Sequence, residues 1–227
     1  MYKLLLPYDV YERHRKVASF IKENETVVDI GGELDHLSQF INPKKLIVAN
    51  LRNGDVIILK DKLPFEESSF DIVCAIDVLE HIPKAKRGQF INSLLVTASK
   101  KVIMSFPIAT ASHTQYEKET LKWLQANGKN VEYLKEHIRF SLPTKEEVKQ
   151  ITAGEKVDIF YSGNLALNRI LFRIFMIDPK IKFARRLIYV TKLIFNLITN
   201  QFFYLILSDK PYSDSVNRAY LIINKHT

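Results

Sequence analysis

The sequence predicts an α/β fold in which a doubly wound parallel sheet is covered by helices on both faces. Short β-branched runs alternate with helical segments through the first half of the chain. The central run, FDIVCAI (70–76), is continuously apolar, which is typical of a strand buried on both faces. The length of 227 residues suits one core with an embellishment, so we expect a single domain over 1–227.

Local patterns predict the elements of the first half. Apolar residues at helical spacing indicate a helix over 9–23, which ends where Asn24 and Glu25 break the pattern. A second helix is expected around Leu37 to Ile41, and a third from about Lys86 to Ser99. The strands of this half are TVVDI (26–30), KLIVAN (45–50), VIIL (56–59), FDIVCAI (70–76) and KVIMSF (101–106).

The second half is more polar and more helical. Residues 108–155 form a helical segment that we expect on the substrate side of the domain, and Thr144 after Pro143 is typical of a helix start. Two further strands are expected, VDIFYS (157–162) and AYLIIN (219–224). The residues between them contain a helical insert, 165–207, which we interpret as a lid.

Composition is that of a cytoplasmic globular protein. The chain is 47% hydrophobic and 26% charged, which excludes a disordered protein. The single cysteine, Cys74, lies in a strand-like run, so we expect a buried thiol in a reducing compartment. The first apolar run is too short for a signal peptide. The net charge of +8 comes without an Arg-rich run or a zinc-ligand pattern, so nucleic acid is not an expected partner.

The loops that follow the strands are the expected binding site, because doubly wound sheets bind ligands at the carboxyl ends of strands where the strand order reverses. The first of these loops, residues 29–35, reads DIGGELD. A glycine there permits a positive φ and close approach of a ligand, and an acidic residue at the strand end can bind an ammonium group. A plain tight turn explains the two glycines alone equally well.

The most specific motif is LPFEESSFDIVCAIDVLEHIP, residues 63–83. It closely resembles the LPF-x-x-x-SFD-hydrophobic-DVLEHI signature of class I S-adenosylmethionine-dependent methyltransferases. The earlier VVDIGG and the later KKVIMSFP have the matching order and spacing, so the resemblance covers roughly residues 10–110. It implies a Rossmann-like sheet of about seven strands whose last strand, AYLIIN, is antiparallel. It also implies S-adenosylmethionine as the cofactor.

The resemblance implies a role for each matching residue. The first loop would hold the amino-acid end of the cofactor, the second its ribose, the third its adenine, and the fourth would lie beneath the methyl-bearing sulfur. The residues in these four groups are Asp29, Gly31 and Gly32; Asn50 and Leu51; Asp61, Lys62 and Leu63; and Ile76, Asp77 and Val78.

Four positions depart from the family pattern, and two of them make the glycine loop degenerate. Glu33 and Asp35 stand where D-x-G-x-G-x-G has glycine. Asn50 replaces an acidic ribose ligand, and Leu59 stands where an acidic residue usually precedes Leu63 by four positions. These departures leave open a non-catalytic binding module that keeps the methyltransferase fold without its cofactor.

Two histidines are the candidates for a catalytic base, because histidine titrates near neutral pH. His81 belongs to the DVLEHI motif, and His113 follows the next strand. With Asp77 and Glu80 they offer oxygen and nitrogen ligands that a divalent metal accepts. The DVLEHI sequence is common in relatives without metal, so we expect no metal site.

A looser resemblance concerns the acceptor. Residues 135–138, 142–144, 163–165 and 218–220 resemble a methyltransferase type 11-like branch associated with the biosynthesis of cell-surface polysaccharides. The resemblance implies methyl transfer to an oxygen or nitrogen of a small or glycan-type acceptor, with a lipid-linked acceptor among the options. An RNA methyltransferase is an alternative that only the net charge suggests.

The insert 165–207 combines cations with a wide apolar face. Its seven cations face a single acid, Asp178. A narrow polar stripe recurs every three or four positions, at Arg185, Tyr189, Lys192, Asn196 and Thr199. We expect the apolar face to be covered by the domain, by a second copy in a homodimer, or by an anionic membrane at the inner face. The insert is not expected to span a bilayer, since the uncharged run 193–208 is shorter than about 20 residues.

Overall fold

The computed structural model describes residues 2–59 and 62–225. Within these residues seven strands form one sheet in the order β3-β2-β1-β4-β5-β7-β6, so the strand order reverses between β1 and β4. The strands are β1 (Thr26–Ile30), β2 (Lys45–Asn50), β3 (Val56–Ile57), β4 (Phe70–Ile76), β5 (Ala98–Pro107), β6 (Lys156–Ser162) and β7 (Arg218–Asn224). This topology confirms the predicted doubly wound α/β fold.

The last strand runs against both of its neighbours, as predicted. β7 pairs antiparallel with β5 and β6, whereas β1–β2, β1–β4, β2–β3 and β4–β5 are parallel pairs. Arg218, the first residue of β7, lies opposite Pro107 and Ser162, the last residues of β5 and β6. The direction of β7 therefore brings Arg218 to the edge where the parallel strands end.

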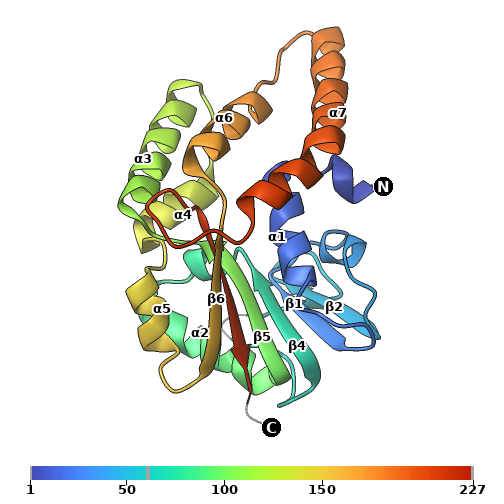
Figure 1. The fold of residues 1–227 in the computed structure, drawn as a ribbon, viewed down its shortest axis with the longest axis vertical. Helices are drawn as coiled ribbons and strands as arrows, with labels where there is room; N and C mark the ends of the chain where they lie inside the picture. The colour runs from blue at the N-terminus through green and yellow to red at the C-terminus, as the bar shows by residue number, and fades with distance from the viewer. Residues whose placement is uncertain (1, 60–61, 226–227) are drawn as a thin grey trace.

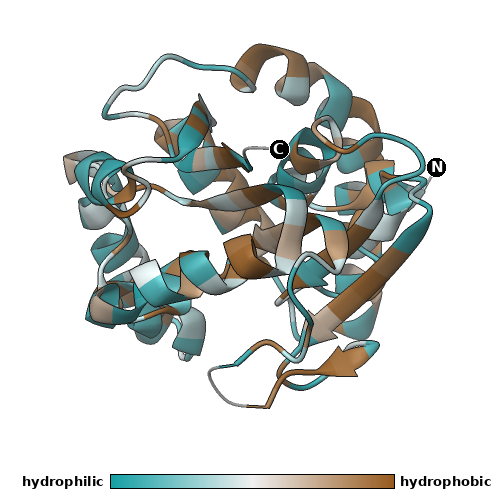
Figure 2. Ribbon diagram, turned by 90° about the horizontal axis from the view of Figure 1, so that it is seen from below, coloured by the Kyte–Doolittle hydropathy of each residue, from teal (hydrophilic) through white to brown (hydrophobic). Residues whose placement is uncertain are grey.

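Two apolar layers, one on each face of the sheet, form the core. Val28 and Val73 contribute to the layer that α2 (Lys84–Thr97) and α5 (Lys145–Ile151) cover. Their neighbours Val27 and Ile72 contribute to the opposite layer, which α1 (Tyr8–Ala18) covers. Such alternation is required of a strand buried on both faces. Figure 2 shows hydrophobic residues running along the strands.

The remaining α-helices gather beyond the carboxyl ends of the parallel strands (Figure 1). They are α3 (Ala111–Ala126), α4 (Glu132–Phe140), α6 (Leu165–Phe175) and α7 (Lys182–Leu207). Thr144 caps α5 as predicted, since its hydroxyl accepts the N–H of Glu147 at 3.0 Å. Several helices thus stand over the edge at which ligands of this fold class bind.

The segment between β1 and β2 contains no α-helix, which contradicts the prediction of a helix around Leu37 to Ile41. The chain forms one 3-10 turn instead, η2 (Leu37–Gln39). Pro43 supplies a reason, because the residue before a proline avoids the helical conformation and a helix here cannot continue through Asn42. Leu37 nevertheless joins the core layer that α1 covers.

Several other boundaries differ from those predicted. Strand β3 stops at Ile57, because β2 ends at Asn50 and offers no partner for residues 58 and 59. Helix α1 ends at Ala18, short of the predicted residue 23. Helix α2 covers 84–97 in place of 86–99, because residue 98 already belongs to β5. Strand β5 is longer than the predicted 101–106, since its pairing with β7 extends to Pro107.

Helix α7 contacts the domain through an apolar cluster, in which its Phe203 and Leu207 pack with Tyr8 of α1, and through polar side chains. Asn196 donates to the carbonyl of Leu5 at 2.9 Å, and Asn200 donates to the carbonyls of Leu4 and Leu6 at 3.0 and 2.9 Å. These carbonyls belong to the 3-10 turn η1 (Tyr2–Leu5) and the residue after it. Both asparagines are buried. The predicted polar stripe therefore turns toward the domain at Asn196.

Much of the apolar surface of α7 is exposed, so the domain supplies little of the covering that was expected from the domain, a second copy or a membrane. Ile198 is 70% exposed and Leu205 is 74% exposed. By length and composition alone, α7 would suffice to cross a membrane, and only 17% of its most apolar stretch is buried. Residues 2–59 and 62–225 thus leave most of this face uncovered.

Candidate functional site

The turn after β1 brings together four residues for which cofactor contacts are predicted. Gly31 has a φ of +79°, and its N–H donates to the carbonyl of Ala49 at 2.7 Å. A Cβ on Gly31 would collide with Val78. Asn50 Nδ2 donates to the carbonyls of Gly31 at 3.2 Å and Gly32 at 2.8 Å. The amide hydrogens of Asn50 hold the turn, and its Oδ1 accepts the N–H of Leu51 at 2.6 Å.

Asp29 is a fully buried carboxylate beneath this turn. Neither of its oxygens has a hydrogen-bond partner among the described residues, and a Cβ on Gly32 would overlap the carboxylate. Burial raises the pKa of Asp29 to about 7. A buried carboxylate without donors is unfavourable, so the ionised form requires a donor or cation that the chain itself does not supply.

The ends of β2 and β3 form an open, apolar part of the edge. Leu51 is 66% exposed and Leu59 is 78% exposed, and Lys62 is also exposed. Leu63 instead packs against the core layer beneath α2. Asp61, the remaining residue predicted near the adenine, lies outside the described residues.

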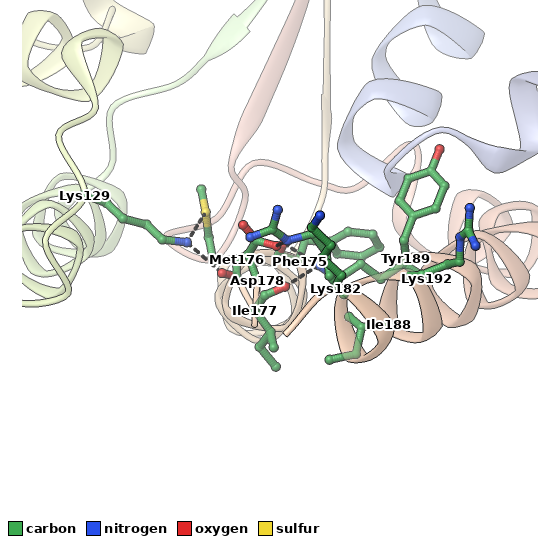
Figure 3. Close-up of a pocket in the computed structure, with 11 residues that line it drawn as sticks. Lys129, Phe175, Met176, Ile177, Asp178, Lys182, Ile188, Tyr189 and Lys192 are labelled. Carbon is green, nitrogen blue, oxygen red and sulfur yellow. Dashed lines mark hydrogen bonds and ion pairs between the residues drawn. The ribbon is translucent and has the colours of Figure 1, made fainter. Parts of the chain in front are cut away.

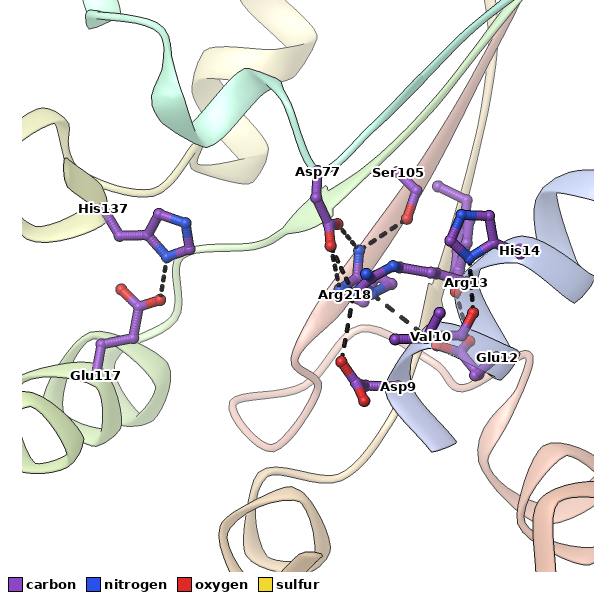
Figure 4. Close-up of polar contacts among 11 residues, drawn as sticks. Asp9, Val10, Glu12, Arg13, His14, Asp77, Ser105, Glu117, His137 and Arg218 are labelled. Atoms are coloured by element: carbon purple, nitrogen blue, oxygen red, sulfur yellow. Dashed lines mark hydrogen bonds and ion pairs between the residues drawn. The ribbon is translucent and has the colours of Figure 1, made fainter. Parts of the chain in front are cut away.

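At the end of β4, two arginines from distant parts of the chain hold Asp77 (Figure 4). Arg13 Nη1, on α1, lies 2.8 Å from one carboxylate oxygen, and Arg218 donates to both oxygens. Arg218 also donates to Ser105 Oγ at 2.9 Å. Burial alone would raise the pKa of Asp77, but the two guanidinium groups outweigh it and hold the pKa well below its ordinary value. Ile76, for which a cofactor contact was also predicted, belongs to the core layer beneath α1.

Two residues beyond Asp77, the 3-10 turn η3 (Leu79–His81) begins and meets α4. Glu80, His81 and His137 each offer one ligand atom, and these atoms lie within 4.8 Å of one another. Glu80 Oε2 and His137 Nε2 are buried and have no hydrogen-bond partner among the described residues. The structure thus places His137, rather than the expected His113, beside Glu80 and His81.

Each of the two histidines, His81 and His137, has a carboxylate beside its Nδ1 atom. His81 Nδ1 lies 2.7 Å from Glu136 Oε2, and His137 Nδ1 lies 2.7 Å from Glu117 Oε1, the latter pair being visible in Figure 4. The ring centroids of the two histidines are 4.8 Å apart. Burial lowers the pKa of His81, and the neighbouring His137 lowers it further.

His113, the second predicted base, is more enclosed than His81. Its Nδ1 lies 2.9 Å from the carbonyl oxygen of Ile108, and the residue is 4% exposed. Burial lowers the pKa of His113. The side chain of His81 is 30% exposed, so His81 is the more accessible of the two histidines.

A buried arginine ties η3 to α4 and α5. Arg87 is fully buried, and its Nη1 donates to both carboxylate oxygens of Glu147 at 2.9 and 3.1 Å. Its Nε donates to the carbonyl of Ile82 at 3.0 Å, and its Nη2 donates to the carbonyls of Phe140 and Ser141. One side chain therefore fixes the residue after η3 relative to the end of α4.

The sequence did not predict contacts of Arg13, Arg218 or His137 at this site, although His137 and Arg218 belong to the segments 135–138 and 218–220 that carry the looser resemblance. An arginine that opens an otherwise apolar strand needs an acidic partner when buried, which is a usable signal for Arg218. Arg13 had no such signal, since it lies in a helix with ordinary charged neighbours. Only the tertiary fold brings the three residues to the end of β4.

A basic groove of about 610 Å³ lies where α6, α7 and the loop after α3 meet (Figure 3). Lys129 donates to the carbonyl of Met176 at 2.7 Å, and Lys192 donates to those of Phe175 and Ile177, both at 2.8 Å. Five cations line the groove with a single acid: Lys129, Lys182, Arg185, Arg186, Lys192 and Asp178. The groove therefore carries an excess of positive charge.

Comparison with known proteins identifies similar structures but no similar sequences. No family model matches the chain, and no curated protein matches it. A methyltransferase from Thermotoga maritima, described as a possible histamine N-methyltransferase, is 10% identical over 99% of this chain and 92% of its own, with a TM-score of 0.54.

Two further structures are similar to the same extent. A SAM-dependent methyltransferase from Archaeoglobus fulgidus is 14% identical over 96% of this chain and 94% of its own, with a TM-score of 0.53. The plantazolicin methyltransferase BpumL, solved with SAH, is 14% identical over 96% of this chain and 85% of its own, also with a TM-score of 0.53. At such identities the likeness concerns the fold alone. The chain therefore has the fold of the class I S-adenosylmethionine-dependent methyltransferases.

Proposed function

We propose that the protein is an S-adenosylmethionine-dependent methyltransferase that acts on an oxygen or nitrogen of a small or glycan-type acceptor. The observation that carries the proposal is the buried, unpartnered Asp29 carboxylate beside the glycine turn of a sheet with the methyltransferase strand order. The turn stands next to the point where the strand order reverses, which is the usual ligand site of such sheets.

The amino-acid end of the cofactor carries one ammonium and one carboxylate, so it needs hydrogen-bond acceptors for the first and donors for the second. Asp29 offers acceptors for the ammonium, and Arg13 Nε is a buried donor without a partner among the described residues. Asn50 Oδ1 accepts the N–H of Leu51 and keeps a second lone pair for a ribose hydroxyl, and the exposed Leu51 offers apolar surface to the adenine. Glu33 and Asp35 are exposed, so their carboxylates stay in solvent and outside the turn.

S-adenosylmethionine supplies a methyl group on a positively charged sulfur. The protein then has to align the acceptor with that group and exclude water. Of the two predicted bases, His81 has the stronger support, because its ring is partly exposed and Glu136 orients it. His113 has its Nδ1 bound to a backbone carbonyl in a buried position.

Calorimetric titration with S-adenosylmethionine and with its demethylated product tests the proposal. We expect the dissociation constant to tighten about tenfold from pH 6 to pH 8, because ionisation of Asp29 near pH 7 creates the charge that binds the ammonium. Asp29→Asn should remove this pH dependence. Glu33→Gln, which alters an exposed charge in the same turn, is the matched control and should keep it.

The absence of heat from folded protein at millimolar cofactor would contradict the proposal and favour the non-catalytic binding module. Binding with the same pH dependence in Asp29→Asn and wild type would instead place the ammonium elsewhere. Activity on glycan-type acceptors is then assayed only with a protein that binds the cofactor.

We further propose that α7 holds the protein on the cytoplasmic face of an anionic membrane, where a lipid-linked acceptor would be within reach. Exposed apolar residues recur along the helix at Phe183, Leu187, Ile194, Ile198, Phe202 and Leu205. The basic groove lies at the start of the same helix, so apolar insertion and attraction to lipid phosphates act together. Within the described residues, Lys182 and Arg186 have no acidic partner.

Co-sedimentation with vesicles tests this attachment. We expect the protein to sediment with anionic vesicles and to remain in solution with neutral ones, and Arg185→Glu with Arg186→Glu should abolish sedimentation. The control carries the same change of charge at the exposed Lys84 and Lys149, which lie on α2 and α5, and should still sediment. Protein that stays in the supernatant with every vesicle would contradict the proposal, and a dimer in analytical ultracentrifugation would then assign the face to a second copy.

A further inference from the structure

The hydrogen bonds of His81 and His137 engage the Nδ1 atom of each ring, and the two ring centroids lie 4.8 Å apart. An imidazole that donates its Nδ1–H to a carboxylate, as Glu136 and Glu117 allow, keeps the lone pair of Nε2 for a ligand. A carboxylate on the far nitrogen is the arrangement that orients histidines for metal binding.

Three carboxylates lie around the two histidines. Glu80, Glu117 and Glu136 surround the two histidines, and Glu80 is only 1% exposed. The arginines at the end of β4, Arg13 and Arg218, are engaged with Asp77. A carboxylate is rarely buried unless it is paired or bound to a metal. Glu80 Oε2 and His137 Nε2 have neither partner among the described residues.

We propose that Glu80, His81 and His137 form a binding site for one divalent transition-metal ion at the end of β4. Their ligand atoms already lie within 4.8 Å of one another, so small side-chain rotations bring all three to one ion. Two imidazole nitrogens and one carboxylate oxygen suit Zn²⁺, and also Mn²⁺ and Fe²⁺. Three protein ligands leave at least one coordination position for water or another oxygen ligand.

The fold holds the two ligand-bearing segments together before any ion binds. Arg87 bonds to the carbonyl of Ile82, next to His81, and to the carbonyls of Phe140 and Ser141, at the end of the helix that carries His137. Because the side chain of His81 is 30% exposed, an ion reaches the site from that side. In the metal-bound protein His81 is a ligand and does not accept a proton.

Titration of chelator-treated protein with Co²⁺ tests the site without any cofactor, so its outcome is independent of the proposed methyl transfer. We expect one bound Co²⁺ per chain, with visible absorption bands, and displacement by Zn²⁺. Glu80→Gln and His137→Gln should each weaken binding by at least a hundredfold. Glu136→Gln and Glu117→Gln, which alter the orienting carboxylates, should weaken it by about ten- to a hundredfold.

His36→Asn is the matched control, since His36 is a partly exposed histidine outside the cluster, and it should bind Co²⁺ as wild type does. Circular dichroism of each variant verifies folding, and His81→Asn, at a partly exposed position, provides a ligand variant that spares the core. Wild-type protein without Co²⁺ or Zn²⁺ binding at millimolar metal would overturn the proposal. Equal affinity in wild type, His81→Asn and Glu80→Gln would overturn it as well.

Discussion

Asp77 and Glu80 are two carboxylates three residues apart at the end of the same strand, yet their surroundings are opposite. Asp77 meets Arg13 and Arg218, which hold its pKa below the ordinary value. Glu80 is buried with an unpartnered oxygen, and burial raises its pKa well above the ordinary value, with the charge of Asp77 adding to the effect. The oxygens of Asp77 are thus paired within the protein, whereas Glu80 Oε2 has no hydrogen-bond partner among the described residues.

The difference separates polar groups that stabilise the fold from those arranged for a ligand. The Asp77 cluster joins α1, β4 and β7, whose sequence positions are far apart, so its role is to fasten elements together. In the clusters around Glu80 and around Asp29, by contrast, the carboxylates themselves have buried oxygens without partners among the described residues, whereas in the Asp77 cluster only Arg13 Nε lacks one. Native structures have few such atoms, and they tend to mark functional positions.

The strongest test of this distinction is Arg218→Met. Removal of the guanidinium leaves Asp77 with Arg13 alone and leaves the buried Glu12, whose carboxylate lies 4.0 Å from Arg218, without its cation. We expect the free energy of unfolding at pH 7 to fall by about 5 kcal/mol, the upper end for loss of one partner of a buried pair. Chemical denaturation measures the change. Arg13→Met is the control, and we expect a smaller loss of stability from it because Arg218 still pairs with Asp77 and Glu12. Equal losses in the two variants would contradict this expectation.

The pH dependence of stability sharpens the contrast for Asp29. Its pKa is about 7 in the folded protein against an ordinary 3.8, so the folded state holds this proton more tightly. The contribution is fully favourable below about pH 4 and is lost as the pH rises to 7, by roughly 4 kcal/mol in total. Denaturation of wild type and Asp29→Asn from pH 4 to pH 8 should show a gap that widens and then levels off. A constant gap would contradict the buried, unpartnered state.

The smallest expected effects come from the same acid-to-amide change at the two neighbouring carboxylates. In metal-free protein at pH 8, Asp77→Asn should lower the free energy of unfolding by about 2 kcal/mol, because charge-assisted hydrogen bonds are lost. Glu80→Gln should raise it by about 1 kcal/mol, because the unfavourable burial of an ionisable carboxyl group disappears. Thermal denaturation distinguishes the signs. A loss at both positions would mean that the Glu80 cluster is complete in itself.

The sequence was most informative where local pattern and tertiary structure agree. The bounds of β1, β2 and β4 were predicted to the residue, since central strands buried on both faces need continuous apolar runs. Strand β3 was predicted too long, because its end depends on where its neighbour β2 stops. The helix expected around Leu37 was wrong, because apolar spacing alone does not register the constraint that Pro43 places on Asn42.

The candidate site was predictable in part for the same reason. Asp29 and Asn50 lie at the carboxyl ends of strands, and Gly31 and Val78 come just after strands. Because these strand ends must converge, the proximity of the four residues follows from topology. His137 comes to Glu80 through the packing of α4, an element whose position no local pattern specifies. The cofactor roles of these residues remain predictions, which the calorimetric experiments address.

The path of the chain through α6 and α7 has a consequence for how this protein could be modified. The segment that contains α6 and α7 begins after β6, and its two ends lie next to each other. Gly163 N–H donates to the carbonyl of Leu207 at 2.9 Å, and Lys210 N–H donates to that of Tyr161 at 2.9 Å. A loop whose two ends meet can be exchanged or shortened without a change in strand register. Helices α6 and α7 therefore form an insertion between the adjacent strands β6 and β7. Their apolar surface can therefore vary among related chains, or be grafted onto another sheet of this topology, while the edge that holds Asp29 and Glu80 stays the same.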